Sequence, residues 1–163
     1  MKLWAWEKKN LPSMAHAART AVAATASVLI ARLVGMPEAY WAAIATLVVM
    51  QSSLGATLTL SIERIVASAL SASLGALEST YFAQNLFAFG LTIFLLGLIA
   101  FVFRLQKTGY RYAGITFAII VLIPRTQPPW IVATHRFLEV TIGILIAVAV
   151  VALWPEEGRA RKR

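Results

Sequence analysis

Six long apolar stretches constrain the fold of this chain more than any other feature. They total 114 of the 163 residues, and 60% of the chain is apolar while 13% is charged. Soluble domains have about 45–50% apolar and about 25% charged residues, so this composition favours an integral membrane protein. The stretches are Met14 to Val34, Ala39 to Leu54, Leu58 to Leu77, Leu86 to Phe103, Tyr110 to Pro124 and Ile131 to Trp154.

The stretch lengths predict a compact helical bundle. At about 1.5 Å per residue, the first, third and sixth stretches can cross a hydrocarbon core of about 30 Å, and the fourth is just long enough. The second and fifth reach only about 24 and 22 Å, so they need a thinned bilayer or cover from neighbouring helices. No stretch alternates as a membrane β-strand does. We therefore predict an all-α membrane protein with six transmembrane helices.

Three regions follow from this pattern. Residues 1–13 are predicted to be a cytoplasmic N-terminal segment, residues 14–154 the six-helix membrane module, and residues 155–163 a basic cytoplasmic tail. The first apolar stretch is too long for the core of a secretory signal, so we expect it to be retained as a helix. The strongest break between helices is the run from Pro124 to Pro129, because proline removes backbone donors.

The basic residues predict the orientation. With both ends of the chain in the cytoplasm, ten Lys and Arg residues lie inside, whereas Arg125 is the one in an outside loop. This distribution obeys the positive-inside rule, and it assigns the net charge of +8 to topology and lipid contact rather than to nucleic acid. The inside residues are Lys2, Lys8, Lys9, Arg104, Lys107, Arg111, Arg159, Arg161, Lys162 and Arg163.

A shift of 72 residues aligns the two halves of the chain. It places Arg32 on Arg104, Tyr40 on Tyr112 and Arg64 on Arg136, and it also superposes the two short stretches. Each half holds three crossings, so the second half must run in the opposite direction to the first. We therefore predict a 3+3 inverted repeat, a common plan in secondary transporters.

Charges inside the apolar stretches are the first candidate pathway residues. They include Arg19, Arg64, Arg136 and Glu139, because membrane charges normally face the bundle interior or an aqueous path. Two structural alternatives stay open. Arg19 could extend to the cytoplasmic surface, and Arg136 could pair with Glu139 three residues later on the same helix face. If Arg64 and Arg136 are not structural, a positive charge at each mouth of a pore favours anions.

Polar breaks after the two short stretches give further candidates. In transporters with inverted repeats, paired interrupted segments are the best indication of the substrate site. They direct attention to Gln51 and Ser52 in the first half, and to Arg125 and Gln127 in the second.

Other chemistry is scarce, so we expect neither an enzyme nor a bound cofactor. The chain has no cysteine, and its two histidines lie on different predicted helices without further ligands at metal spacing. It contains no glycine-rich phosphate loop and no recognition motif for nucleic acid.

Short motifs resemble a known family. The run from Tyr40 to Ala45, the run from Val48 to Ser52 and the run from Glu63 to Val66 resemble the membrane module of the fusaric acid resistance and aromatic acid exporter family. Arg136 and Gly143 are similar to the matching residues of its second half, and the resemblance covers residues 15–154. It implies a bacterial inner-membrane protein whose modules work in pairs, with basic residues along an anion pathway.

These observations together predict an inner-membrane exporter or channel for small organic anions, aromatic carboxylates among them. Its expected partners are membrane lipid, the anion and a second copy of the chain in a homodimer. Two alternatives remain: a membrane subunit that anchors or assembles a partner complex without transport, and a small exporter of cationic drugs.

Overall fold

The computed structural model describes residues 14–82, 85–103, 107–124 and 126–154. All regular structure within these ranges is α-helical, as predicted. The six helices are α1 (Met14–Leu33), α2 (Tyr40–Val49), α3 (Leu54–Tyr81), α4 (Leu86–Val102), α5 (Lys107–Leu122) and α6 (Pro129–Leu153).

The largest difference from the predicted stretches lies between α2 and α3. The second stretch was predicted to continue to Leu54, but α2 ends at Val49 and Met50 is extended. The Ser53 side chain then accepts a hydrogen bond from the backbone N–H of Ala56, which satisfies an otherwise free donor of the first turn of α3. Leu54 therefore begins α3, whose 28 residues make it the longest helix described.

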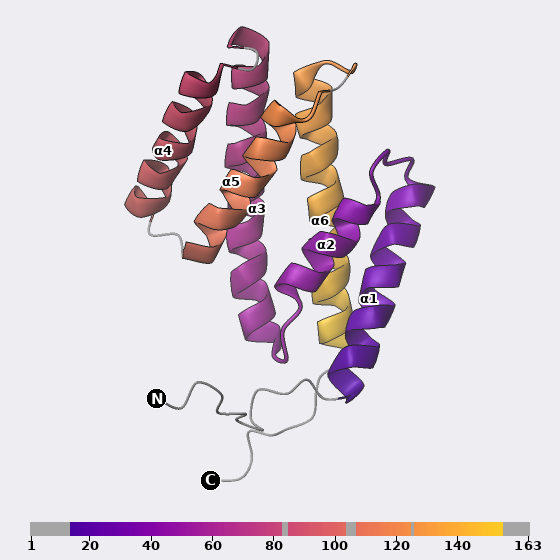
Figure 1. Cartoon of the computed structure of the whole chain (residues 1–163). Coiled ribbons are helices and arrows are strands. Elements are labelled where there is room, and N and C mark those ends of the chain that lie inside the picture. The colour runs from indigo at the N-terminus through magenta and orange to yellow at the C-terminus, as the bar shows by residue number, and fades with distance from the viewer. Residues whose placement is uncertain (1–13, 83–84, 104–106, 125, 155–163) are drawn as a thin grey trace, which may run out of the picture.

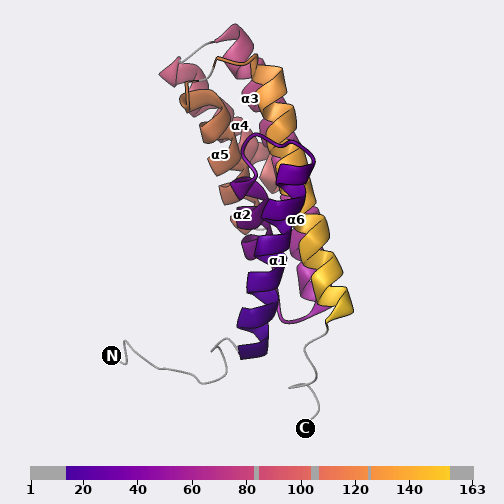
Figure 2. The same cartoon turned by 90° about the vertical axis from the view of Figure 1, so that its right-hand side faces the viewer.

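Helices α3 and α6 lie side by side at the centre of the bundle (Figure 1). Figure 2 shows that α2 and α5 cover one face of this central pair. Helix α2 packs on α6 and α5 packs on α3, while α1 contacts α2 and α6, and α4 contacts α5 and α3. We call the end where α1 begins and α6 finishes the terminal end, and the opposite end, with residues 34–39 and 123–128, the loop end (Figure 1).

The crossing of α2 and α6 depends on a glycine. A Cβ atom at Gly143 would overlap the carbonyl oxygen of Ala42, so the two backbones are in direct contact there. The Thr46 hydroxyl lies 2.9 Å from both the Ala42 and the Gly143 carbonyl oxygens and links the helices at the same point. This contact fixes the start of α2, and the loop before it, against α6.

Three of the described helices are long and apolar enough to cross a membrane, namely α1, α3 and α6. Helices α2 and α4 and the segment Thr108–Leu122 of α5 are apolar but shorter. Apolar side chains are widely exposed on α4, where Phe87 and Phe101 are 81% and 82% accessible. Such a surface suits contact with lipid or with another protein rather than with water.

Candidate functional site

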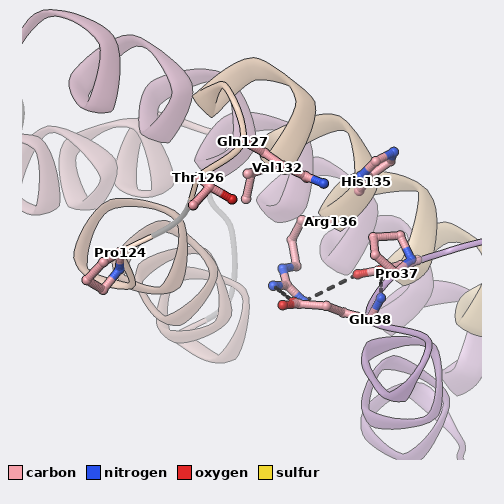
Figure 3. A pocket seen from close by; sticks show the side chains of 9 residues that line it. Pro37, Glu38, Pro124, Thr126, Gln127, Val132, His135 and Arg136 are labelled. Atoms are coloured by element: carbon pink, nitrogen blue, oxygen red, sulfur yellow. Dashed lines mark hydrogen bonds and ion pairs between the residues drawn. The ribbon is translucent and has the colours of Figure 1, made fainter.

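A pocket of about 400 Å³ opens at the loop end of the bundle. Its volume falls within the range of about 300–1,000 Å³ that is usual for small-molecule sites. Figure 3 shows Arg136 and Glu38 pointing toward each other there, with Thr126 and Gln127 from the loop before α6 nearby. The lining residues are Pro37, Glu38, Pro124, Thr126, Gln127, Val132, His135, Arg136 and Glu139.

Arg136 lies on the buried face of α6, seven residues after its start, and is 2% exposed. Its Nη2 donates to the Oε2 of Glu38 and its Nη1 to the Oε2 of Glu139, the latter at 3.3 Å. The guanidinium also stacks over the Trp41 ring, with 4.2 Å between Cζ and the ring centroid. The pair with Glu139 that the i, i+3 spacing allowed is therefore present.

The two carboxylates around Arg136 differ in how firmly they are held. Glu139 is 1% exposed, and its Oε1 accepts the backbone N–H of Glu38 at 2.9 Å. The Glu38 side chain comes from the loop before α2 and is 24% exposed. Its Oε2 also accepts the indole N–H of Trp41 at 3.2 Å. One guanidinium thus faces two carboxylates, which gives these three side chains a formal charge of −1.

Arg64 has a different environment on α3. It is 4% exposed, and its guanidinium stacks over the Tyr112 ring at 4.1 Å. Its Nε and Nη1 have no hydrogen-bond partner in the described part of the chain, where no ion pair joins it to Glu63. The adjoining cavity is about 10 Å³ and is lined by Val48, Leu60, Glu63, Arg64, Thr108, Gly109 and Tyr112. A space of that size holds at most about one water molecule.

Arg19 connects three helices at the terminal end. Its Nη1 donates to the Trp154 carbonyl at 3.1 Å, and its Nη2 donates to the Gln51 carbonyl at 2.8 Å and lies 3.2 Å from the His16 Nδ1. Because Arg19 is 1% exposed, it does not extend to the surface. A cation beside the last carbonyls of α6 is favourable, so this contact ties the end of α6 to α1 and to the loop after α2.

The structure brings some of the remaining candidates together and separates others. Gln127 lies in the same pocket as Arg136 and Glu139. Gln51 and Ser52 lie at the terminal end, in the loop between α2 and α3, far from that pocket. Arg125 lies outside the described residues. The two polar breaks therefore lie at opposite ends of the bundle.

Residues 24–150 match the family described as fusaric acid resistance protein-like. The chain belongs to this family. The resemblance predicted from the motifs beginning at Tyr40 is thus confirmed, and the chain is placed in a family of membrane transporters rather than of enzymes. Searches of curated proteins and of solved structures found no match.

The charges within the apolar stretches did not identify three residues of this fusaric acid resistance-like module that contact the arginines. Glu38 binds Arg136, and the rings of Trp41 and Tyr112 cover the two guanidinium groups. The Tyr40–Trp41 motif was noted for family resemblance, but nothing in it indicated contact with an arginine almost one hundred positions away. One feature of the sequence could have indicated Glu38. It is an acidic residue directly after Pro37, in the loop at the same end of the bundle as Arg136.

The pocket is lined by groups that can contact charged organic molecules. Among the residues that the structure describes, no three His, Asp or Glu side chains are grouped to hold a metal ion. The lining holds a guanidinium and two carboxylates, groups that form charge-assisted hydrogen bonds.

Proposed function

We propose that this family member is a bacterial inner-membrane exporter or channel for small organic anions, aromatic carboxylates among them. The observation that supports this most is the environment of Arg64. No acid in the described part of the chain is hydrogen-bonded to this buried guanidinium, so together with the small cavity beside it the group is suited to bind a carboxylate that passes through.

The buried charge of Arg64 has a free-energy cost that a bound carboxylate would offset. An arginine in a membrane helix costs roughly 2.5–3.5 kcal/mol on insertion scales when nothing offsets its charge. The cation–π contact between Arg64 and the Tyr112 ring offsets about 0.5–2 kcal/mol of this cost. A bidentate carboxylate would offset most of the remainder, so the site favours an anion whenever the cavity widens enough to admit one.

The proposed route joins the two arginine regions. The wide pocket at the loop end, with Arg136, Glu139 and Gln127, forms one mouth. Arg64 lies ten residues after the start of α3, nearer the terminal end, where Gln51 and Ser52 would border the other mouth. The cavity beside Arg136 measures about 400 Å³ and the one beside Arg64 about 10 Å³, so the proposed route would have to widen at Arg64.

A 3+3 inverted repeat of six crossings is part of the proposal, and the helix packing supports it. Helix α2 packs on α6 as α5 packs on α3, and α1 contacts α6 as α4 contacts α3. Each repeat-related arginine also stacks on an aromatic ring from the second helix of the other half. These pairs are what a pseudo-two-fold axis between α3 and α6 would generate.

We further propose that both ends of the chain are cytoplasmic, so that the wide pocket faces outward. The count of ten basic residues inside against one in an outside loop supports this. Cysteines introduced at Lys9 and Gln127 give the test. An impermeant thiol reagent should label the second in intact cells and not the first, and the reverse pattern would contradict the orientation.

The proposed homodimer follows from the short helices. Helix α2 spans 10 residues, or about 15 Å, and needs protein cover in a bilayer. A second copy would provide it. Crosslinking in native membranes followed by mass measurement in mild detergent should give two chains per particle, and one chain in both measurements would exclude the dimer.

Export of cationic compounds is the second candidate, because the two carboxylates beside Arg136 would attract a cation. Proteoliposomes loaded separately with labelled benzoate and with tetraphenylphosphonium distinguish the two. Benzoate flux that depends on the protein supports anion transport, and flux of the cation alone supports the second candidate. Absence of both would favour a subunit that does not transport.

Arg64→Gln is the decisive variant, because it keeps polarity and removes the charge. We expect at least a tenfold loss of benzoate flux in protein of normal yield and thermal stability. Arg32→Gln, which removes an equal charge at an exposed position of α1, is the matched control and should transport normally. Normal flux through well-folded Arg64→Gln would contradict the proposal.

A further inference from the structure

The contacts around Arg136 describe a carboxylate-binding site that is already filled. The Arg136 Nη2 and the Trp41 Nε1 both donate to the same oxygen, the Oε2 of Glu38. Two donors from different helices therefore converge on one point where a carboxylate oxygen lies. Arg136 and Glu38 both line the open pocket, so a carboxylate from solution could reach the same donors.

We propose that Glu38 is a tethered competitor for the transported anion, and that an anion takes its place on Arg136 as Glu38 takes up a proton. The proposal rests on the anion transport put forward above and adds its coupling to protons. No covalent bond changes. One proton moves from solution to the Glu38 carboxylate for each anion bound.

Glu38 rather than Glu139 fits this role because of how each is anchored. Glu139 is buried within α6 and holds both the Arg136 Nη1 and the backbone N–H of Glu38. Glu38 lies in a loop outside the helices, with 24% of its side chain exposed. Displacing its side chain needs one rotation into the pocket, and the Glu38 backbone stays bonded to Glu139.

Charge explains why displacement needs a proton. An ionised Glu38 and an entering carboxylate would carry like charges in the same partly buried pocket, beside the carboxylate of Glu139. A proton on Glu38 removes the repulsion between Glu38 and the anion. Like charges at close range in a medium of reduced dielectric repel strongly, so the neutral form is favoured.

The pocket matches an aromatic carboxylate in particular. Its volume of about 400 Å³ exceeds what a carboxylate group alone requires. The Pro37 and Val132 side chains give part of the lining an apolar character next to Arg136. A benzoate-like anion can therefore place its carboxylate on Arg136 and Trp41 and its ring against this apolar part.

Binding of benzoate by the purified full chain in detergent tests the proposal. Benzoate stays ionised between pH 6 and pH 8, because carboxylic acids of its class lose their proton near pH 4. We expect its affinity to fall about tenfold for each pH unit above the range where Glu38 is protonated, as one linked proton requires. A weakly buffered solution with an indicator dye should show close to one proton taken up per benzoate bound.

The Glu38→Gln variant should remove the competitor. We expect benzoate to bind at pH 8 at least tenfold more tightly than to the wild type, without pH dependence and without proton uptake. Glu78→Gln is the matched control, since Glu78 is a buried carboxylate outside the pocket with no hydrogen-bond partner among the described residues. It should keep the wild-type slope and proton count.

Other titratable groups at the pocket define the contrary outcomes. Arg136, Glu139 and His135 face the same space. Proton uptake that persists in Glu38→Gln would assign the proton to His135 or Glu139 and overturn the proposal. Uptake of no proton by the wild type would overturn it without any variant. Absence of benzoate binding at every pH would instead contradict the proposed anion transport itself.

Discussion

The regions around Arg136 and Arg64 occupy matching sequence positions but have opposite environments. Each arginine is at least 96% buried and stacks on an aromatic ring from the other half of the chain. Arg136 has two carboxylate partners and borders a pocket of about 400 Å³. Arg64 has no acid bonded to it among the described residues and borders about 10 Å³.

The sequence explains the difference. A shift of 72 residues relates Glu38 to Tyr110 and Glu139 to Ala67, so neither acid has a counterpart near Arg64. An anion that binds Arg136 must therefore displace a glutamate of the chain, whereas no glutamate among the described residues has to be displaced from Arg64. Substitutions in both regions test whether this difference is real.

Arg136→Gln should have the largest effect on stability. It removes the Arg136 partner of the buried Glu139, and removing one partner of a buried ion pair costs about 3–5 kcal/mol. Thermal unfolding in detergent and membrane yield are the measurements. The double variant Arg136→Gln, Glu139→Gln should recover much of the loss, since it also removes the buried carboxylate charge that faced Arg136. Equal stability of the two variants would show that charge is not the cause.

Gly143→Ala should have the second-largest effect on stability. The Cβ of the alanine would overlap the backbone of Ala42, and a helix backbone cannot move aside without losing other contacts. Overpacking of this kind costs about 1–3 kcal/mol. Gly75→Ala is the control from the other half, since its Cβ would meet the Ile120 side chain at 2.9 Å or more rather than a backbone carbonyl at 2.1 Å, so a smaller shift relieves the contact. Unfolding midpoints should fall clearly for the first variant and less for the second. The opposite order would mean that α2 and α6 do not cross as described.

Tyr112→Leu should destabilise the chain by about 0.5–2 kcal/mol, the usual value of a desolvated cation–π contact. Tyr112→Phe keeps the ring and should differ little from the wild type. Paired unfolding curves of both variants give the measurement. If both lose the same stability, the phenol hydroxyl rather than the ring supports Arg64.

Arg64→Gln should have the smallest effect on stability, within about 1 kcal/mol of the wild type. Loss of the cation–π contact is offset by relief of a buried, unpaired charge. The same melting experiment that reports a large loss for Arg136→Gln should show this. A loss of several kcal/mol would mean that Arg64 is structural, and the contrast between the two regions would disappear.

Much of the fold could be predicted from the sequence because hydrophobic burial is a local property of each stretch. The six apolar runs mark six helices, and the proline-rich break predicted from Pro124 separates α5 from α6, which begins at Pro129. The start of α3 at Leu54 was missed because it depends on a hydrogen-bonded cap at Ser53 and not on hydropathy. Helix limits set by single side chains are not encoded in an apolar pattern.

For the candidate site, the apolar pattern alone identifies which residues are costly to bury. Arg19, Arg64, Arg136 and Glu139 were identified because a charge within an apolar helix requires an explanation wherever the helix packs. Helix packing supplies the distant partners of these charges. Arg19 donates to the carbonyls of Gln51 and Trp154, and Arg136 donates to Glu38, and each of these three partners is more than 30 positions away. Such partners are set by helix crossings, and a single sequence contains no record of which helices cross.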